Sequence, residues 1–277
     1  MTTTSPAAWR ARYPRAFGAT LPQRAWRWGG MLGVLAGTLA AFLWLDITPQ
    51  RFFSGLAELG RVALLMLPPS PGEYPMELVW AALETLAMAF AGTFIAAVLA
   101  VPLGFLAARN VVSLAPFRFG LRRFLDVLRG VDQLVWALIF VRAVGLGPMA
   151  GVLSIIVTDT GTLAKLYSEA LENADRRQQD GVRAVGGNGL HAARFGLLPQ
   201  SLPLMLAHVL YIFESNVRSS TILGIVGAGG IGFQLSDRIR ALRWDEASFI
   251  ILLILALVAV IDALSGALRR RLISGAR

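Results

Sequence analysis

The sequence of 277 residues contains no cysteine, one lysine and two histidines. Without cysteine it cannot form disulfide bonds, thiolate nucleophiles or cysteine-ligated metal sites. Its lysine, Lys165, is followed by Leu166, whereas a nucleotide-binding P-loop requires serine or threonine after the lysine. His191 and His208 have no metal-like spacing to carboxylates, and the sequence contains neither HExxH nor GxSxG. We therefore expect no metal site, no bound cofactor and no catalytic residue in this chain.

Charged residues are also scarce, at 16% against 56% apolar residues. Soluble domains average about 25% charged and about 45–50% apolar residues, so the composition indicates a membrane protein. The net charge of +9 arises at the two ends, because residues 1–28 hold five arginines without an acid and residues 265–277 hold four. Basic flanks around an apolar body are typical of cytoplasmic membrane margins rather than of nucleic-acid binding.

Six apolar segments predict six membrane-spanning helices, each needing about 20 residues to cross the bilayer. They are Gly29–Leu45, Leu78–Ala107, the shorter Val131–Val144, Pro148–Leu166, Leu197–Phe213 and Ala247–Leu264. Phe52–Leu67, which contains Glu58 and Arg61, predicts an amphipathic helix on the membrane surface. With a cytoplasmic amino terminus, 19 of the 26 basic residues fall in the inward segments 1–28, 108–130, 165–196 and 265–277. This asymmetry predicts that both termini are cytoplasmic.

A glycine-rich stretch follows the fifth predicted span. Gly227, Gly229 and Gly232 fit the GxGxxG pattern, and the β-branched run Thr221–Val226 precedes them. In a dinucleotide-binding fold such glycines follow a strand and approach a pyrophosphate, but here the next acid, Asp237, comes too soon. We interpret the glycines as sites of close backbone packing, or as non-helical backbone that lines a cavity in a membrane bundle.

A longer pattern lies between the fourth and fifth predicted spans. Residues 180–186 read Asp-Gly-Val-Arg-Ala-Val-Gly, and Leu198-Pro199 follows after a gap. This resembles the cytoplasmic EAA loop of permease subunits in binding-protein-dependent ABC importers: Glu-Ala-Ala, three residues, Gly, nine residues, Ile, one residue, Leu-Pro. Gly186, Leu198 and Pro199 occupy matching positions. The departures are Asp180 for the Glu, Gly181 and Val182 for the Ala pair, and Gly196 for the Ile. The alternative is a solvated helical hairpin of mixed charge.

Further segments extend the resemblance to about residues 78–268. Residues 144–151 (VGLGPMAG), 165–172 (KLYSEALE), 213–220 (FESNVRSS) and 224–232 (GIVGAGGIG) look like the phosphonate-uptake permease family. The resemblance implies an all-α membrane protein with six transmembrane helices and the type I ABC importer permease fold. Its expected parts are a basic cytoplasmic segment (1–28), a first transmembrane helix with an outward amphipathic segment (29–76), the core permease domain (77–268) with its coupling loop at 165–199, and a basic cytoplasmic tail (269–277).

The same resemblance implies the partners and the site residues. Expected partners are a second copy of the chain, two ATPase subunits that hold ATP and Mg²⁺, and a periplasmic binding protein, assembled in the lipid of the bacterial inner membrane. The cargo would be a phosphonate or the related oxyanion phosphite. The residues expected to couple to the ATPase are Asp180, Gly181, Arg183, Ala184, Gly186, Leu198 and Pro199. Those expected along the translocation path or gate are Glu214, Asn216, Arg218, Ser219, Ser220, Gly227, Gly229, Gly230 and Gly232.

Three ionisable residues have specific expectations. Arg218 is expected just beyond the fifth span, where its guanidinium can bind two oxygens of an oxyanion. The alternative is that Glu214, four residues earlier on a continuous helix, neutralises it. Glu84 and Asp159 lie inside predicted spans, so we expect them to face the bundle or a cavity, neutralised by a proton or a hydrogen bond from a neighbouring helix.

Other functions remain open at this point. An ABC permease for methionine or glycine betaine shares the glycine-rich element. A secondary transporter would need no ATPase and would show inverted internal repeats, which the sequence does not show. A membrane enzyme would require convergent catalytic groups. Copurification with ATPase subunits discriminates the first possibility from the other two.

Overall fold

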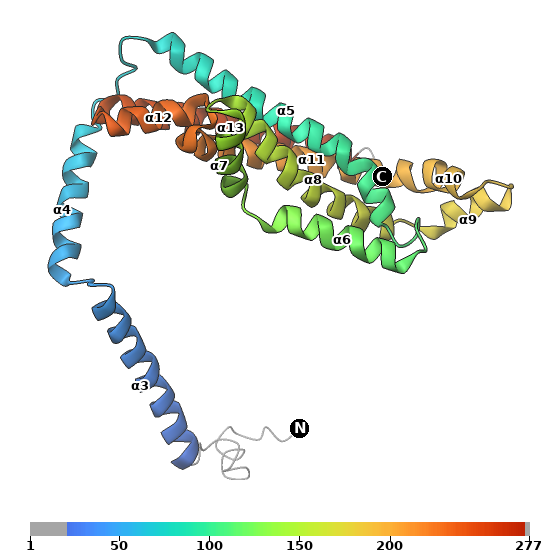
Figure 1. Ribbon diagram of the computed structural model, residues 1–277, viewed down its shortest axis with the longest axis horizontal. Helices are drawn as coiled ribbons and strands as arrows, with labels where there is room; N and C mark the ends of the chain where they lie inside the picture. Colours follow the sequence, from blue (N-terminus) through green and yellow to red (C-terminus); the bar gives the residue numbers. More distant parts are fainter. Residues whose placement is uncertain (1–20, 275–277) are drawn as a thin grey trace, which may run out of the picture. The chain divides into compact units, whose positions relative to one another are not determined.

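The structure is a computed structural model that describes residues 21–274. The chain forms two compact units, one ending at Leu64 and the other beginning at Leu65. Two helices, α3 (Leu21–Trp44) and α4 (Pro49–Leu65), belong to the first part of the chain (Figure 1). Taken together, Ala25–Trp44 and Pro49–Leu65 are long and apolar enough to span a membrane, with a bend of 64° between them. That the first crosses the membrane and the second lies on its surface stays a prediction.

The second unit is a bundle of helices (Figure 1). Its elements are α5 (Pro75–Ala107), α6 (Ala115–Gly130), α7 (Gln133–Val144), α8 (Pro148–Glu172), α9 (Arg176–Ala184), α10 (Gly189–His191), the π-helical turn η1 (Ala192–Leu197), α11 (Leu198–Leu223), the π-helical turn η2 (Gly224–Ala228), α12 (Gly230–Arg240) and α13 (Trp244–Ser274). Residues 21–274 contain no β-strand. The predicted all-α membrane fold is confirmed.

Within residues 21–274, four helical segments are each long and apolar enough to cross a membrane: Pro75–Ala107, Pro148–Glu172, Gly189–Ala228 and Trp244–Leu272. The bent pair α3–α4 raises the number to five. The predicted span Val131–Val144 corresponds to α7, whose 12 residues measure about 18 Å at ~1.5 Å per residue. Because the hydrocarbon core is about 30 Å thick, α7 does not cross it alone. The count of six therefore stays a prediction.

The region 108–130, expected as an inward connection, is mostly helical. Its helix α6 packs against the middle of α8, where the Leu125 carbonyl oxygen lies 2.8 Å from the position that a Cβ at Gly161 would take. This region holds five arginines and an aspartate, but α6 is amphipathic and buries Leu125 against the bundle.

Small residues allow the central helices α5 and α8 to approach closely. A Cβ at Gly92 would lie 2.6 Å from the Ile155 side chain, and a Cβ at Gly104 would lie 2.7 Å from the Cβ of Tyr167. Fully buried alanines line the same contact, among them Ala96, Ala100, Ala150 and Ala164. Membrane helices associate through such small-residue contacts because lipid tails remove the hydrophobic driving force between them. The α5–α8 pair is the framework on which the other helices pack.

Helix α11 is longer than the fifth predicted span. The span was expected to end at Phe213, yet α11 continues to Leu223 and includes Arg218. The helix therefore does not end at Phe213, and Arg218 belongs to the same continuous helix as the predicted span. The run Glu214-Ser215-Asn216 is polar, but Glu214 and Asn216 have partners on neighbouring helices, so the helix continues through it.

Candidate coupling surface and transport pathway

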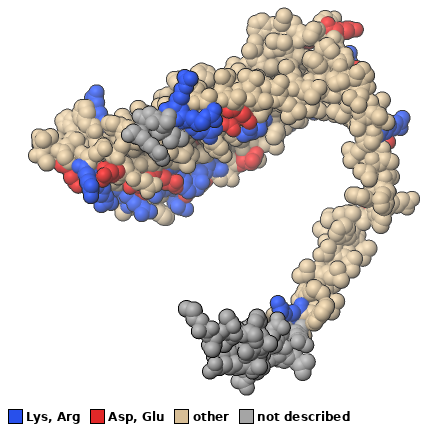
Figure 2. Space-filling view, turned by 180° about the vertical axis from the view of Figure 1, so that it is seen from behind, with Lys and Arg blue, Asp and Glu red and all other residues tan. Residues whose placement is uncertain are grey.

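Helix α9 displays the residues predicted to couple to an ATPase. The Asp175 carboxylate caps its amino terminus by accepting a hydrogen bond of 2.9 Å from the backbone N–H of Arg177. Asp180, Gly181, Arg183 and Ala184 are all exposed, and within α9 only Gln179 is buried. The charged side chains visible in Figure 2 gather largely in the part of the second unit that carries α6 and α9. The helix thus presents a polar, solvent-facing surface.

Gly186 ends this helix. Its φ is +88°, its N–H donates to the Arg183 carbonyl, and the N–H of Gly187 donates to the Val182 carbonyl, each at 3.0 Å. This is the Schellman arrangement, in which glycine adopts a left-handed conformation just past the helix end. No atom lies within 4 Å of a Cβ at Gly186, so this position is open on its outer side.

The second half of the EAA-like loop packs against the first. At Gly196, a Cβ would lie 3.0 Å from the Cα of Gln179, so the isoleucine of the family pattern would not fit here without a shift of α9. Leu198 is partly buried against the main core cluster, and Pro199 is exposed in the first turn of α11. A cavity of about 660 Å³ lies between these elements and the end of α5, lined in part by Phe105, Arg183 and Arg194.

A charged cluster at the carboxyl end of α8, which the sequence analysis missed, connects that helix to the α5–α6 connection. The Glu172 carboxylate accepts a 2.7 Å hydrogen bond from the backbone N–H of Arg109 and another from the Arg122 guanidinium. The Asn110 amide donates to the Leu171 carbonyl at 2.6 Å. The sequence feature that could have indicated this cluster is the opposite charge of the arginines in the amphipathic stretch 115–130 and of Glu172 at the end of α8. The cluster bonds the α5–α6 connection to the end of α8, just before the chain enters α9.

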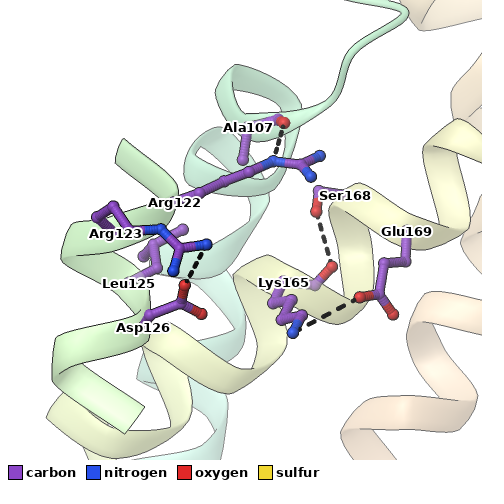
Figure 3. Close-up of a pocket in the computed structure, with 8 residues that line it drawn as sticks. All are labelled: Ala107, Arg122, Arg123, Leu125, Asp126, Lys165, Ser168 and Glu169. Atoms are coloured by element: carbon purple, nitrogen blue, oxygen red, sulfur yellow. Dashed lines mark hydrogen bonds and ion pairs between the residues drawn. The ribbon is translucent and has the colours of Figure 1, made fainter. Parts of the chain in front are cut away.

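Figure 3 shows the adjacent pocket of about 110 Å³ between α6 and α8. Arg122 donates to the Ala107 carbonyl at 3.0 Å, and Arg123 pairs with Asp126 at 3.0 Å. A hydrogen bond from Arg129 holds the pKa of Asp126 below its usual value. Lys165 and Glu169 approach to 4.0 Å on the opposite wall. The charges are internally paired, which indicates a structural contact.

A buried polar cluster joins three helices in the bundle. The Asn216 amide on α11 donates to Asp159 on α8 at 2.5 Å and to Thr93 on α5 at 2.8 Å. The three side chains are 4%, 6% and 2% exposed. The prediction that Asp159 faces the bundle with a hydrogen bond from a neighbouring helix is confirmed. Asn216, expected along a path or gate, instead lies between packed helices.

We expect Asn216→Ala to destabilise the bundle, because Asp159 and Thr93 would both lose their donor in a buried site. Leaving a buried acceptor unsatisfied costs about 1–3 kcal/mol. The measurement is the melting temperature of the detergent-solubilised protein. Ser219→Ala on the same helix is the control, since Ser219 is only partly buried. An unchanged melting temperature for Asn216→Ala would show that the cluster contributes nothing to stability.

The glycine-rich stretch reverses the chain between α11 and α12. Gly227, Gly229 and Gly230 have φ values of +101°, +79° and +69°, a region that favours glycine. The Gly227 carbonyl accepts from the Gly147 N–H at 2.9 Å, and the Ile231 N–H donates to the Thr85 hydroxyl at 2.8 Å. These bonds attach the reversal to α5 and to the start of α8.

At the other glycines of this stretch, Gly224 and Gly232, close backbone contact leaves no room for a side chain. A Cβ at Gly224 would lie 2.8 Å from the Cα of Gly232, and a Cβ at Gly232 would overlap the Thr221 carbonyl oxygen. Residues 221–226 are helical, so a strand does not precede the glycines and the dinucleotide interpretation is excluded. The close-packing interpretation agrees with these contacts. Glu84, as expected, faces the bundle: its Oε1 lies 3.0 Å from a Cβ position at Gly229.

Arg218 lies in a network of four charged residues shared by α11 and α13. Its guanidinium is 3.7 Å from Glu214 and 3.3 Å from Asp262, and Arg269 reaches Glu214 at 2.9 Å. The predicted pairing of Arg218 with Glu214 is thus present, while the sequence did not indicate Asp262 and Arg269. Ser219 lies partly exposed beside Arg218, and Ser220 is buried with no partner for its hydroxyl among the described residues.

Comparison with known proteins agrees with this architecture. Residues 100–274 match the family described as binding-protein-dependent transport system inner membrane component. The chain is 36% identical over 270 residues to the phosphite transport system permease protein PtxC of Stutzerimonas stutzeri, covering 96% of this chain and 95% of that one. It is 40% identical over 245 residues to the phosphate-import permease protein PhnE of Mycolicibacterium smegmatis, covering 88% of this chain and 46% of that one. The chain therefore spans less than half of the Mycolicibacterium relative.

Solved structures show the same fold. An inward-facing MetNI methionine ABC transporter superposes with a TM-score of 0.63 at 24% identity, covering 72% of this chain and 98% of that one. An amino acid ABC transporter superposes with a TM-score of 0.60 at 18% identity, covering 72% and 95%. The family match, the permease relatives and the shared fold together show that the chain belongs to the inner membrane components of binding-protein-dependent transport systems.

Proposed function

We propose that this chain is the permease subunit of an ATP-driven importer for a phosphonate or a related oxyanion such as phosphite. The observation that carries the proposal is the match over nearly the full length of a relative named as a phosphite permease. A second candidate is import of methionine, which rests on weaker matches to methionine permeases at 27% and 23% identity.

The chain lacks a P-loop, so ATP and Mg²⁺ would be held by separate ATPase subunits docked on α9 and the turn after it. A periplasmic binding protein would deliver the anion to the opposite side, with both termini of this chain in the cytoplasm. The basic residues of the inward segments support that orientation. Selection of the cargo would rest mainly on the binding protein.

Reconstituted vesicles containing the chain, its ATPase subunits and the binding protein test the proposal. We expect uptake of phosphite or methylphosphonate that requires ATP and persists without a proton gradient. Methionine in place of the phosphorus anion is the competing cargo. Uptake of methionine alone would overturn the choice of cargo, and uptake driven by a proton gradient without ATP would overturn the ABC mechanism.

We further propose that two copies of this chain form the pathway. The 277 residues contain one EAA-like loop, whereas a pair of ATPase subunits offers two docking surfaces. The Mycolicibacterium relative, of which the matched segment is 46%, has room for two such domains in one chain. Native mass spectrometry of the complex should give two copies of this chain with two ATPase subunits. One copy, or a different permease in the second place, would contradict the proposal.

A further inference from the structure

The position of the charged network of Arg218, Glu214, Asp262 and Arg269 conflicts with a lipid-facing surface. Glu214, Arg218 and Asp262 belong to segments long and apolar enough to span a membrane, and Arg269 lies near the end of one of them, where the basic tail is expected to begin. The side chains of Arg218 and Asp262 are 48% and 41% exposed in one protomer. Ionisable groups inside membrane spans face a bundle interior or a water-filled cavity rather than hydrocarbon. This face of α11 and α13 therefore borders a polar space.

The two carboxylates of the network are held unequally. Glu214 has two cationic partners, Arg269 at 2.9 Å and Arg218 at 3.7 Å, and is 14% exposed. Arg269 is further fixed by stacking over Tyr211, 5.9 Å from the ring centroid. Among the residues that the structure describes, Asp262 has Arg218 as its one ion-pair partner, with both of its oxygens 3.3 Å from the same nitrogen. The Arg218–Asp262 pair is thus longer than the Arg269–Glu214 pair, and both of its side chains are more exposed than those of that pair.

We propose that Arg218 exchanges Asp262 for the transported anion, so that this ion pair forms a transient anion-binding site within the permease. The inference rests on the proposed function for the identity of the anion. A guanidinium binds two oxygens of a carboxylate or of a phosphorus oxyanion with the same fork. Asp262 and the anion therefore compete for the same donors, while Arg269 keeps Glu214 neutralised throughout.

Competition by Asp262 provides a route for release. The two arginines and two carboxylates balance, so an added anion is attracted by Arg218 and repelled by the neighbouring carboxylates. An isolated buried arginine would hold an oxyanion tightly and slow its departure. Here Asp262 takes back the guanidinium as the anion leaves. Arg218 is the binding residue, and Asp262 acts through it as a positioning residue.

The test is uptake of phosphite and methylphosphonate by the reconstituted complex carrying Asp262→Asn. Removing the competitor should lower the KM about tenfold and lower the maximal rate by a similar factor, because the anion binds longer. Asp237→Asn is the matched control: it removes one carboxylate paired with an arginine, Arg238 at 2.9 Å, on α12 and outside the network. It should leave both constants unchanged.

Two further variants keep the inference falsifiable if a single charge change prevents assembly. The double variant Arg218→Gln/Asp262→Asn removes the pair without changing the net charge; it should assemble, hydrolyse ATP and transport at least ~tenfold more slowly. Arg218→Lys keeps the positive charge but cannot bind two oxygens of the anion with two parallel N–H groups, so it should raise the KM for uptake.

Wild-type uptake by the double variant would overturn the inference, as would Asp262→Asn behaving like Asp237→Asn. These outcomes leave the proposed function intact as long as the unaltered complex transports phosphite or methylphosphonate. If the unaltered complex transports neither anion, the proposed function fails and the inference fails with it.

Discussion

Replacing Gly232 with alanine is expected to prevent assembly of the folded permease, although alanine normally stabilises a helix. Gly232 lies in the first turns of α12, where a Cβ would overlap the Thr221 carbonyl oxygen and lie 3.1 Å from the Cα of Gly224. Both neighbours are backbone atoms, so no side-chain rotation relieves the overlap. Overpacking of this kind costs about 1–3 kcal/mol and occasionally more, and here it would displace α12 from α11.

Gly120→Ala is the matched control, because Gly120 lies inside α6 with no atom within 4 Å of its Cβ position. Helix propensity alone favours alanine over glycine by about 1 kcal/mol at both positions. The two substitutions should therefore have opposite signs. The measurements are the yield of monodisperse protein after detergent extraction and its melting temperature. Equal melting temperatures for the two variants would contradict the close packing at Gly232.

Much of the helical architecture could be predicted because apolar length is a local property. The runs at 78–107, 148–166 and 247–264 each appear inside helices that are long enough to span. The EAA-like spacing placed Asp180, Gly181, Arg183 and Ala184 in a coupling loop, and in the structure these four residues lie on the short helix α9. The pairing of Glu214 with Arg218 followed from their spacing of four residues on one helix.

The features that the sequence did not reveal depend on contacts between distant segments. Asp262 meets Arg218 across 44 residues, and no periodicity links residues on different helices. The length of α11 was underestimated because Asn216 is polar, although its partners Thr93 and Asp159 lie on two other helices. The helix α6 was also not predicted, because its sequence is rich in charged residues. Its packing against α8 depends on the absence of a side chain at Gly161. In both helices, contacts with neighbouring helices thus determine the structure more than the polarity of the local sequence does.

Substitution of Gly186 separates two roles that the structure allows for it. Its φ of +88° and its place in the Schellman motif make it a helix cap, and any other residue is strained there. Its open outer side also leaves room for a docked ATPase surface. We expect Gly186→Glu to leave the permease folded and inserted but to abolish transport and binding-protein-stimulated ATP hydrolysis.

The series Gly186→Ala, Gly186→Asn and Gly186→Glu distinguishes docking from capping. Asparagine tolerates the left-handed conformation better than alanine or glutamate, so loss of capping alone would make Asn the mildest change. A docked surface is instead obstructed in proportion to side-chain size, which would make Ala the mildest and Glu the most severe. Because α9 presents a polar face and a Cβ at Gly186 would have no atom of the described residues within 4 Å, we expect the order set by size. Stimulated ATPase activity, measured at equal amounts of assembled complex, reports that order. If Gly186→Asn retains full coupling while Gly186→Ala loses it, then Gly186 acts as a helix cap and the ATPase docks elsewhere.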